Sequence, residues 1–268
     1  MSGIKLVISD VDGTLVTNDK RLTDASCRAA ATLAARGIGF TVTSSRPPFG
    51  LRMLVEPLAL KLPIGAFNGG MIVDPAMAIV EQHLIPQAAA KRCLDVLSQF
   101  DVEPWLFTKD KWTVRNGALS YVAREQRTIQ TDPDIVSDFA PFLAQAGKIV
   151  GVSEDFEKLA RCESAMQEAL GATASAARSQ RYYLDITPPA LDKGTFVNAL
   201  AKRLGIAREA IVTIGDMPND LTMFRRSGRS IAMGNADDSV KREAHDVTRS
   251  NEEDGFAWAV EKIILASA

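Results

Sequence analysis

The chain opens on a short apolar run that ends in polar residues. Residues 4–9 read Ile-Lys-Leu-Val-Ile-Ser, and Asp10, Asp12 and the turn residue Gly13 follow directly. A run of this kind predicts a buried strand of a parallel sheet. Carboxylates just beyond the C-terminal end of such a strand lie at the edge where open α/β sheets bind ligands. An Asp-Gly pair is also typical of an ordinary turn, so other segments must decide between the two interpretations.

The same pattern of helices and apolar strands recurs in the first and last parts of the chain. Strands are expected at 38–43, 64–67, 211–214 and 230–233, and helices at 23–36, from about 47, at 193–204 and from 238. Strands that alternate with helices predict an α/β fold with a parallel sheet. The strands at 38–43 and 64–67 are also followed by small polar residues, which places further candidate ligand-binding groups at strand ends.

The middle of the chain has a different pattern. A hairpin is expected from 105–108 and 112–114, and helices over 117–127, 134–145 and 156–170. No repeat or low-complexity linker separates this stretch from its neighbours. It is therefore interpreted as an insertion that two connecting segments, near residues 83 and 187, join to the rest of the chain. We therefore predict a core domain of residues 1–82 and 188–268 and an inserted α/β domain of residues 83–187.

Composition narrows the class of partner. The 268 residues carry a formal net charge of -2, without the dominant basic stretch that a nucleic-acid-binding protein needs. No apolar run approaches membrane-spanning length and no targeting segment is recognised, so a soluble cytoplasmic protein without nucleic-acid or membrane partners is expected. The three cysteines are far apart, which suits a reducing compartment. Nothing in the sequence indicates the oligomeric state.

A second acidic pair follows the strand at 211–214. Asp216 and Asp220 come after that strand, and in a parallel sheet they lie at the same edge as the first acidic pair. Carboxylates packed so closely repel one another unless a cation neutralises them, and an all-oxygen ligand set favours Mg²⁺. The alternative is a helix cap, since residues 218–220 also suit a helix start. The two pairs together favour the Mg²⁺ site.

Two further residues suit an anionic ligand. Lys193 lies at the start of a predicted helix, where the helix dipole disfavours a cation and a phosphate or carboxylate partner is therefore plausible. Ser44 directly follows the strand at 38–43, and its hydroxyl and nearby backbone amides suit a phosphate. Each residue taken alone has an ordinary structural explanation, a solvent-exposed lysine or a helix cap.

Together these residues resemble the haloacid dehalogenase superfamily, and most closely its Cof-type phosphatases, over nearly the whole chain. The resemblance rests on Asp10-Val11-Asp12-Gly13-Thr14, Ser44, Lys193 and Gly215-Asp216 with Asn219-Asp220, in the family's order. Residues 68–70, 232–236 and 251–255 are similar to the family's core loops. This chain has Ser44-Ser45-Arg46 where Thr-Gly-Arg is common, which keeps the hydroxyl but loses a flexible glycine. The resemblance implies a Rossmann-like parallel-sheet core with an inserted α/β cap.

The resemblance also implies roles for individual residues. Asp10 is the expected nucleophile, which forms an aspartyl-phosphate, and Asp12 is the expected general acid and base. Asp10, Asp216 and the backbone carbonyl of Asp12 would bind Mg²⁺, with Asp220 behind them. The expected phosphate- and substrate-binding residues are Gly13, Ser44, Ser45, Arg46, Asn68, Gly69, Lys193 and Asn219.

The implied activity is therefore Mg²⁺-dependent hydrolysis of a small phosphorylated metabolite, with a sugar phosphate as the best class. A phosphomutase of the same superfamily and a catalytically silent metal-binding module are the alternatives. Substrate choice is expected to depend on the insertion. The candidate substrate contacts there are Trp105, Trp112, Arg178, Arg181 and Tyr183, although aromatic residues in a small domain more often belong to its core.

Overall fold

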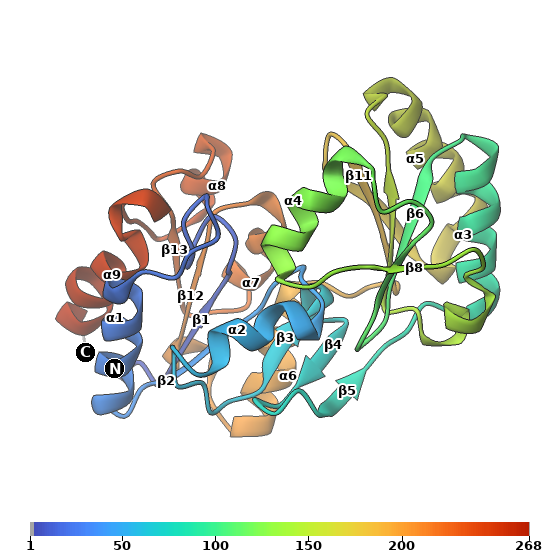
Figure 1. Cartoon of the computed structure of the whole chain (residues 1–268). Helices are drawn as coiled ribbons and strands as arrows, with labels where there is room; N and C mark the ends of the chain where they lie inside the picture. The colour runs from blue at the N-terminus through green and yellow to red at the C-terminus, as the bar shows by residue number, and fades with distance from the viewer. Residues whose placement is uncertain (1–2, 268) are drawn as a thin grey trace. The chain divides into compact units, whose positions relative to one another are not determined.

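The computed structural model describes residues 3–267, which fold into two compact units (Figure 1). The core unit is built from Met1–Ser45, Leu51–Val80 and Asp192–Ala268. The insertion unit is built from Arg46–Gly50 and Glu81–Leu191. Each unit has a sheet of its own, so the predicted α/β class, a parallel-sheet core with a second α/β part, is confirmed.

The core unit contains a five-stranded parallel sheet in the order β14-β13-β12-β1-β2. Its strands are β1 (Leu6–Ser9), β2 (Gly39–Val42), β12 (Ile211–Gly215), β13 (Arg229–Ala232) and β14 (Asp246–Val247). The central strands β1 and β12 are fully buried because helices cover both faces of the sheet. The first predicted strand therefore lies inside the sheet, between β12 and β2, with its C-terminal end beside that of β12.

Two helical layers cover this sheet (Figure 1). Helices α1 (Asp24–Ala35) and α9 (Gly255–Ala259) pack together on one face, where the rings of Phe40 and Phe256 lie 5.2 Å apart. Helices α6 (Lys193–Leu204), α7 (Leu221–Phe224) and α8 (Asp238–Glu243) pack with the other face through one apolar cluster that includes Ile8, Phe196 and Met223. This second layer places the N-terminus of α6 near the strand ends.

The third expected strand exists, but it belongs to another sheet. β3 (Ile64–Ala66), β4 (Met71–Val73) and β5 (Ile79–Gln82) form a three-stranded sheet in that order, with β3 and β4 antiparallel. An isolated parallel bridge joins Thr43 to Gly65. The helix expected from about residue 47 is a 3-10 turn over Pro48–Leu51 followed by the short α2 (Arg52–Val55).

The insertion unit contains a six-stranded sheet in the order β10-β11-β9-β6-β7-β8. Its strands are β6 (Glu103–Phe107), β7 (Trp112–Val114), β8 (Asp134–Ile135), β9 (Lys148–Val152), β10 (Ser175–Gln180) and β11 (Tyr183–Thr187). Helices α3 (Gln87–Gln99) and α5 (Phe156–Leu170) cover one face, and α4 (Ser120–Ile129) lies on the other side (Figure 1). The hairpin of β6 and β7 and the helix over 156–170 confirm two predictions.

Two predicted helices of the insertion differ from the structure. The expected helix over 134–145 is instead the edge strand β8 and a 3-10 helix over Ala140–Gln145. The carboxylate of Asp138 accepts a hydrogen bond from the amide of Ala140 (2.9 Å) and Pro141 lacks an amide hydrogen, so a helix does not continue through this point. Helix α4 begins at Ser120 and not at 117, because the side chain of Asn116 accepts a hydrogen bond from the amide of Ala118 (2.9 Å) in a turn. Within the described residues, no helix is both long enough and apolar enough to span a bilayer.

Candidate active site

Asp10 and Asp216 extend two neighbouring strands of the core sheet. Ser9 lies opposite Ile214 in the parallel register of β1 and β12, and the amide of Asp10 donates to the carbonyl of Ile214 (2.9 Å). Both carboxylates are buried, at 4% and 7% exposure. Oxygen atoms of Asp10, Asp216 and Asp220 lie within 4.8 Å of one another. The structure thus brings three of the four predicted carboxylates together.

Lys193 is the first residue of α6 and is buried beside this cluster. The preceding Asp192 accepts a hydrogen bond from the amide of Thr195 (2.7 Å) in a capping box, which determines where the helix begins. The Lys193 ammonium donates to Asp10 Oδ1 and to Asp220 Oδ1, each at 2.6 Å. Burial alone would lower the pKa of Lys193, but the two carboxylates raise it above its ordinary value. Lys193 therefore stays charged.

Asp220 holds the loop after β12 in place. Its Oδ2 accepts hydrogen bonds from the amides of Asp216 (2.8 Å) and Met217 (2.9 Å), while its Oδ1 accepts from Lys193. The side chain is fully buried. Because both of its oxygens already accept short hydrogen bonds, Asp220 is better suited to positioning Lys193 and Asp216 than to binding a cation directly.

Gly13 lies against the carboxylate of Asp216. A Cβ atom at Gly13 would lie 2.3 Å from Asp216 Oδ2, and the backbone has a φ of +80°, so a side chain is excluded on both counts. The hydroxyl of Thr14 donates to Asp216 Oδ1 (2.9 Å), and the side-chain amide of Asn235 donates to the carbonyl of Gly13 (2.9 Å). The first motif and the loop after β12 are therefore packed as one unit.

The electrostatics of the cluster suit a cation. Three buried carboxylates face a single ammonium, so the group carries excess negative charge when ionised. Burial, followed by the charges of Asp220 and Asp216, raises the pKa of Asp10 well above its ordinary value against the opposing effect of Lys193. Burial and the charge of Asp220 raise the pKa of Asp216 to about 6. A bound divalent cation would favour the ionised forms, and Mg²⁺ prefers such oxygen ligands.

The side chain of Asp12 lies apart from this group. Its carboxylate Oδ1 forms an ion pair with Lys20 Nζ at 2.8 Å, and both side chains are partly exposed. Residues Asp10, Asp216 and Asp220 thus form the carboxylate group, and a role of Asp12 in metal binding through its backbone carbonyl stays a prediction. Sequence reasoning missed Lys20, because a lysine in a polar loop gives no local signal of its partner.

The other predicted phosphate-binding residues lie on loops beside α6. The backbone carbonyl of Ser44 accepts from the amide of Asn68 (2.8 Å), and Asn219 donates to the side-chain oxygen of Asn68 (3.4 Å). Gly69 has a φ of +91°, and a Cβ atom there would lie 2.7 Å from the carbonyl of Asp192 at the start of α6. The structure thus links three of these loops to the helix that carries Lys193.

Ser45 and Arg46 follow Ser44 at the boundary between the two units. Ser45 is half-buried and ends the first segment of the core unit. Arg46 is buried, belongs to the segment 46–50 of the insertion unit, and donates to the carbonyl of Gly50 (3.2 Å). Phosphate binding by these two residues stays a prediction.

Comparisons with known proteins agree with this arrangement. The profile of the haloacid dehalogenase-like hydrolase family matches residues 7–260. A 5-amino-6-(5-phospho-D-ribitylamino)uracil phosphatase of Bacillus subtilis is 29% identical, with 97% of this chain and 98% of the relative aligned. The pyridoxal phosphate phosphatase of Escherichia coli is 25% identical over 94% of this chain and 96% of its own length.

Solved structures share the fold over the same extent. A haloacid dehalogenase-like hydrolase from Bacteroides thetaiotaomicron superposes with a TM-score of 0.91 at 27% identity, covering 97% of this chain and 99% of the other. A sugar phosphatase of haloacid dehalogenase subclass IIB, at 20% identity, shares the fold with a TM-score of 0.81 over 96% of this chain and 98% of its own. With the motifs packed around Asp10 and Lys193, these matches show that the chain belongs to the haloacid dehalogenase-like hydrolase family, as a phosphoric monoester hydrolase of the Cof type.

Proposed function

We propose that this protein hydrolyses a small phosphorylated metabolite, with a sugar phosphate as the favoured class, through a phosphorylated Asp10 and with Mg²⁺ as cofactor. The observation that carries the proposal is the buried contact of Asp10 with Lys193 at 2.6 Å, in a group of three carboxylates within 4.8 Å. The proposed nucleophile Asp10, the ammonium of Lys193 and a set of hard oxygen ligands therefore lie close together.

The metal would be held by the carboxylates of Asp10 and Asp216 and by the backbone carbonyl of Asp12. The elevated pKa values of Asp10 and Asp216 support this, because burial of their charges is unfavourable without a compensating cation. Asp220 would not contact the metal directly, because its two oxygens accept hydrogen bonds from the Lys193 ammonium and from backbone amides. When bound, Mg²⁺ would offset the repulsion between the Asp10 carboxylate and the phosphate dianion.

In the first half-reaction an Asp10 carboxylate oxygen attacks phosphorus and the bond from phosphorus to the ester oxygen breaks. Lys193 favours the ionised form of Asp10 and stabilises the oxygens of the transferring phosphoryl group. Backbone amides of the loops, the Ser44 hydroxyl and the side chain of Asn219 would complete the phosphate contacts. Gly13, Ser45, Arg46, Asn68 and Gly69 are proposed to line the same site.

Asp12 would transfer the protons. It gives a proton to the departing alcohol oxygen, and as a carboxylate it then takes a proton from the water that hydrolyses the phosphorylated Asp10. The carboxylate of Asp12 forms an ion pair with Lys20 at 2.8 Å. When Asp12 is protonated it loses its negative charge, and the electrostatic attraction to the Lys20 ammonium is lost. We infer that Asp12 exchanges Lys20 for the substrate oxygen during the reaction.

The insertion is proposed to act as a cap that sets substrate specificity, with residues 83–187 as the cap and 1–82 with 188–268 as the catalytic core. Support comes from the two compact units, each with its own sheet and apolar cluster. Lys193 and the three buried carboxylates all come from the core unit, which leaves residues 83–187 free to differ between enzymes that share the chemistry.

The proposal is tested by phosphate release from p-nitrophenyl phosphate with Mg²⁺ and with a chelator. Asp10→Asn is expected to abolish turnover in a folded protein, because an amide is not a nucleophile toward phosphorus. Asp19→Asn, an exposed carboxylate in the adjacent loop, is the matched control and is expected to keep wild-type turnover. Turnover by a folded Asp10→Asn protein would refute the nucleophile assignment. Transfer of phosphate between positions of a sugar without net release would indicate a mutase.

A further inference from the structure

The insertion residues that the sequence suggested as substrate contacts take part in the packing of the insertion itself. Trp105 and Trp112 are buried, and their rings meet edge to face at 5.1 Å, while the ring of Tyr183 meets that of Trp105 at 5.4 Å. Arg178 forms an ion pair at 2.7 Å, and Arg181 lies over an aromatic ring. These contacts explain the five residues within the fold of the insertion.

Lys20, in the core unit, contacts the carboxylate that the proposed mechanism uses for proton transfer. Its Nζ atom lies 2.8 Å from Asp12 Oδ1, and the two side chains are 24% and 27% exposed. Ion pairs that are this open to solvent contribute little to stability. The contact of Lys20 with Asp12 therefore needs a reason other than the stability of the fold.

The backbone of Lys20 has the left-handed conformation. Its φ is +64°, a region that is unfavourable for a residue with a Cβ atom and that glycine adopts readily. Such conformations persist only where the surrounding structure imposes them, and they cluster at functional sites. A glycine here would relieve the backbone but would remove the ammonium from Asp12. The chain thus keeps an unfavourable backbone at the position that supplies this cation.

Hydrogen bonds within the loop impose this conformation. The amide of Lys20 donates to the carbonyl of Thr17 (2.8 Å), and the amide of Thr17 donates to the carbonyl of Arg21 (3.0 Å). The hydroxyl of Thr17 accepts from the amide of Arg21 (3.2 Å). An isolated bridge also joins Val16 to Asp12. The loop therefore doubles back, and Lys20 returns to the side of Asp12.

A second loop braces the first. The buried side-chain amide of Asn251 donates to the carbonyl of Val16 (3.1 Å) and to the side-chain oxygen of Asn18 (3.2 Å). The carboxylate of Glu252 accepts from the amide of Asn18 (2.6 Å). Residues 251–255, which resemble a core loop of the family, thus hold the loop that carries Lys20.

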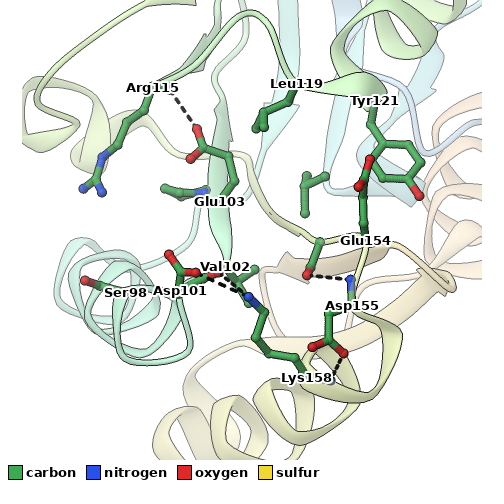
Figure 2. A pocket seen from close by; sticks show the side chains of 13 residues that line it. Ser98, Asp101, Val102, Glu103, Arg115, Leu119, Tyr121, Glu154, Asp155 and Lys158 are labelled. Atoms are coloured by element: carbon green, nitrogen blue, oxygen red, sulfur yellow. Dashed lines mark hydrogen bonds and ion pairs between the residues drawn. The ribbon is translucent and has the colours of Figure 1, made fainter.

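A lysine of the insertion unit resembles Lys20 but has no catalytic partner. Figure 2 shows an open pocket of about 540 Å³ where Lys158 donates to the carbonyl of Asp101 (2.9 Å) and contacts its carboxylate (3.5 Å). The side chain of Lys158 is 25% exposed, and Asp101 has a φ of +49°. Its partner carboxylate is fully exposed in the turn after α3. Lys158 is therefore a matched control for Lys20.

We propose that Lys20 is a positioning residue for the second half-reaction, in which it holds the Asp12 carboxylate in place to take a proton from the attacking water. Asp12 has then given its own proton to the departed alcohol, so its negative charge attracts the ammonium of Lys20. A carboxylate that is already oriented needs less ordering to reach the transition state. The inference rests on the proposed phosphatase function.

The step is balanced without a further reactant. The water oxygen attacks phosphorus, one water proton passes to the Asp12 carboxylate, and the bond between phosphorus and the Asp10 oxygen breaks. Asp10 is released as a carboxylate, and inorganic phosphate leaves. Lys20 keeps its protons throughout, so it acts only through the orientation of Asp12.

The kinetics of p-nitrophenyl phosphate separate the two half-reactions. Because p-nitrophenolate departs with little help from an acid, kcat/KM reports formation of phosphorylated Asp10, whereas slow hydrolysis of that intermediate lowers kcat and KM together. For Lys20→Met, kcat is expected to fall about tenfold to a hundredfold, the effect of a misplaced catalytic group, with kcat/KM nearly unchanged. A rapid burst of p-nitrophenol, about one per enzyme molecule, should precede the slow steady state.

Matched variants control for charge and for the ion pair. Lys20→Arg keeps a cation and is expected to restore kcat and remove the burst. Arg21→Met removes the neighbouring exposed cation of the same loop, and Lys158→Met removes the comparable lysine of the insertion; both should keep the wild-type kcat. An unchanged kcat without a burst in Lys20→Met would overturn the proposal. A fall of kcat/KM as large as that of kcat would also overturn it, because it would indicate a structural role.

Lys20→Gly tests whether the residue is kept for function. It relieves the left-handed backbone, so its midpoint of urea unfolding is expected to equal or exceed that of the wild type, while its kcat falls as in Lys20→Met. A lower midpoint with wild-type kcat would assign Lys20 to the fold and overturn the proposal. A wild-type protein that neither releases p-nitrophenol nor forms a phosphorylated enzyme would refute the proposed function and this inference together. Wild-type turnover that Lys20→Met shares in full would refute the inference alone.

Discussion

The raised pKa of Asp216 makes the stability of the metal-free protein depend on pH. Burial, followed by the charge of Asp220, raises this pKa to about 6, whereas an aspartate in an unfolded chain titrates near about 3.9. Between these values the folded protein keeps a proton that the unfolded chain has lost. The unfolding free energy of the metal-free protein is therefore expected to decrease as pH rises through this range, and the decrease is complete above about pH 6.

The magnitude follows from the two pKa values. One pKa unit corresponds to about 1.4 kcal/mol, so a difference of about two pKa units corresponds to about 3 kcal/mol of unfolding free energy. This is the part of the pH dependence that we assign to Asp216. Because Asp216 is mostly buried, solvent screens this effect only weakly. Mg²⁺ present at about a hundred times its dissociation constant would restore about 2.7 kcal/mol near neutral pH, and less where protons compete for the carboxylates.

Urea unfolding at pH 4 and pH 8, with a chelator and with Mg²⁺, measures this effect. Asp216→Asn is the matched variant, because its amide does not titrate in this range. The unfolding free energy of the wild type is expected to fall by about 3 kcal/mol more than that of the variant between these two pH values without metal. Parallel pH dependences for the two proteins would refute the assignment, as would Mg²⁺ stabilising both proteins equally.

Three substitutions test other parts of the site. Gly13→Ala is expected to lose more stability and Mg²⁺ affinity than Gly37→Ala. Both glycines have a positive φ, which costs a residue with a side chain about 1–2 kcal/mol, but only Gly13 has a neighbouring atom within 4 Å of a new Cβ. Equal losses in urea unfolding would contradict the packing argument. Lys193→Met leaves two buried carboxylates without their cation, so a loss of about 3–5 kcal/mol at pH 7 is expected, and wild-type stability would show that the ion pairs are not needed. Asp12→Asn should lose turnover but bind Mg²⁺ normally in calorimetry, because its carboxylate lies outside the acidic group; weakened Mg²⁺ binding would assign that carboxylate to the metal.

Local pattern was sufficient to predict the catalytic edge of the core. An apolar run followed by Asp10, and another followed by Asp216, predict two strand ends, and the parallel register of β1 and β12 brings these ends together. This prediction succeeds because the side-chain pattern of a buried strand is read within a few residues. The same approach failed over 134–145, where Asp138 and Pro141 interrupt a helical pattern through contacts within the segment itself.

Only the tertiary structure decided the partners of the charged groups. Lys193 and Asp10 are 183 positions apart, and their contact depends on where α6 packs against the sheet. The pairing of Lys20 with Asp12 depends on a loop conformation that neither residue type specifies.

The same holds for the insertion sheet. Trp105 and Asp185 lie on strands that are distant in the sequence, and a third strand between them sets their register. Sequence by itself determined the strands that lead to Asp10 and Asp216 and the residues that follow them, because these depend on neighbours along the chain. It did not predict β4, β5, β9, β10 or β11. The tertiary structure decided which polar side chains meet which partners, because that depends on every element packed around them.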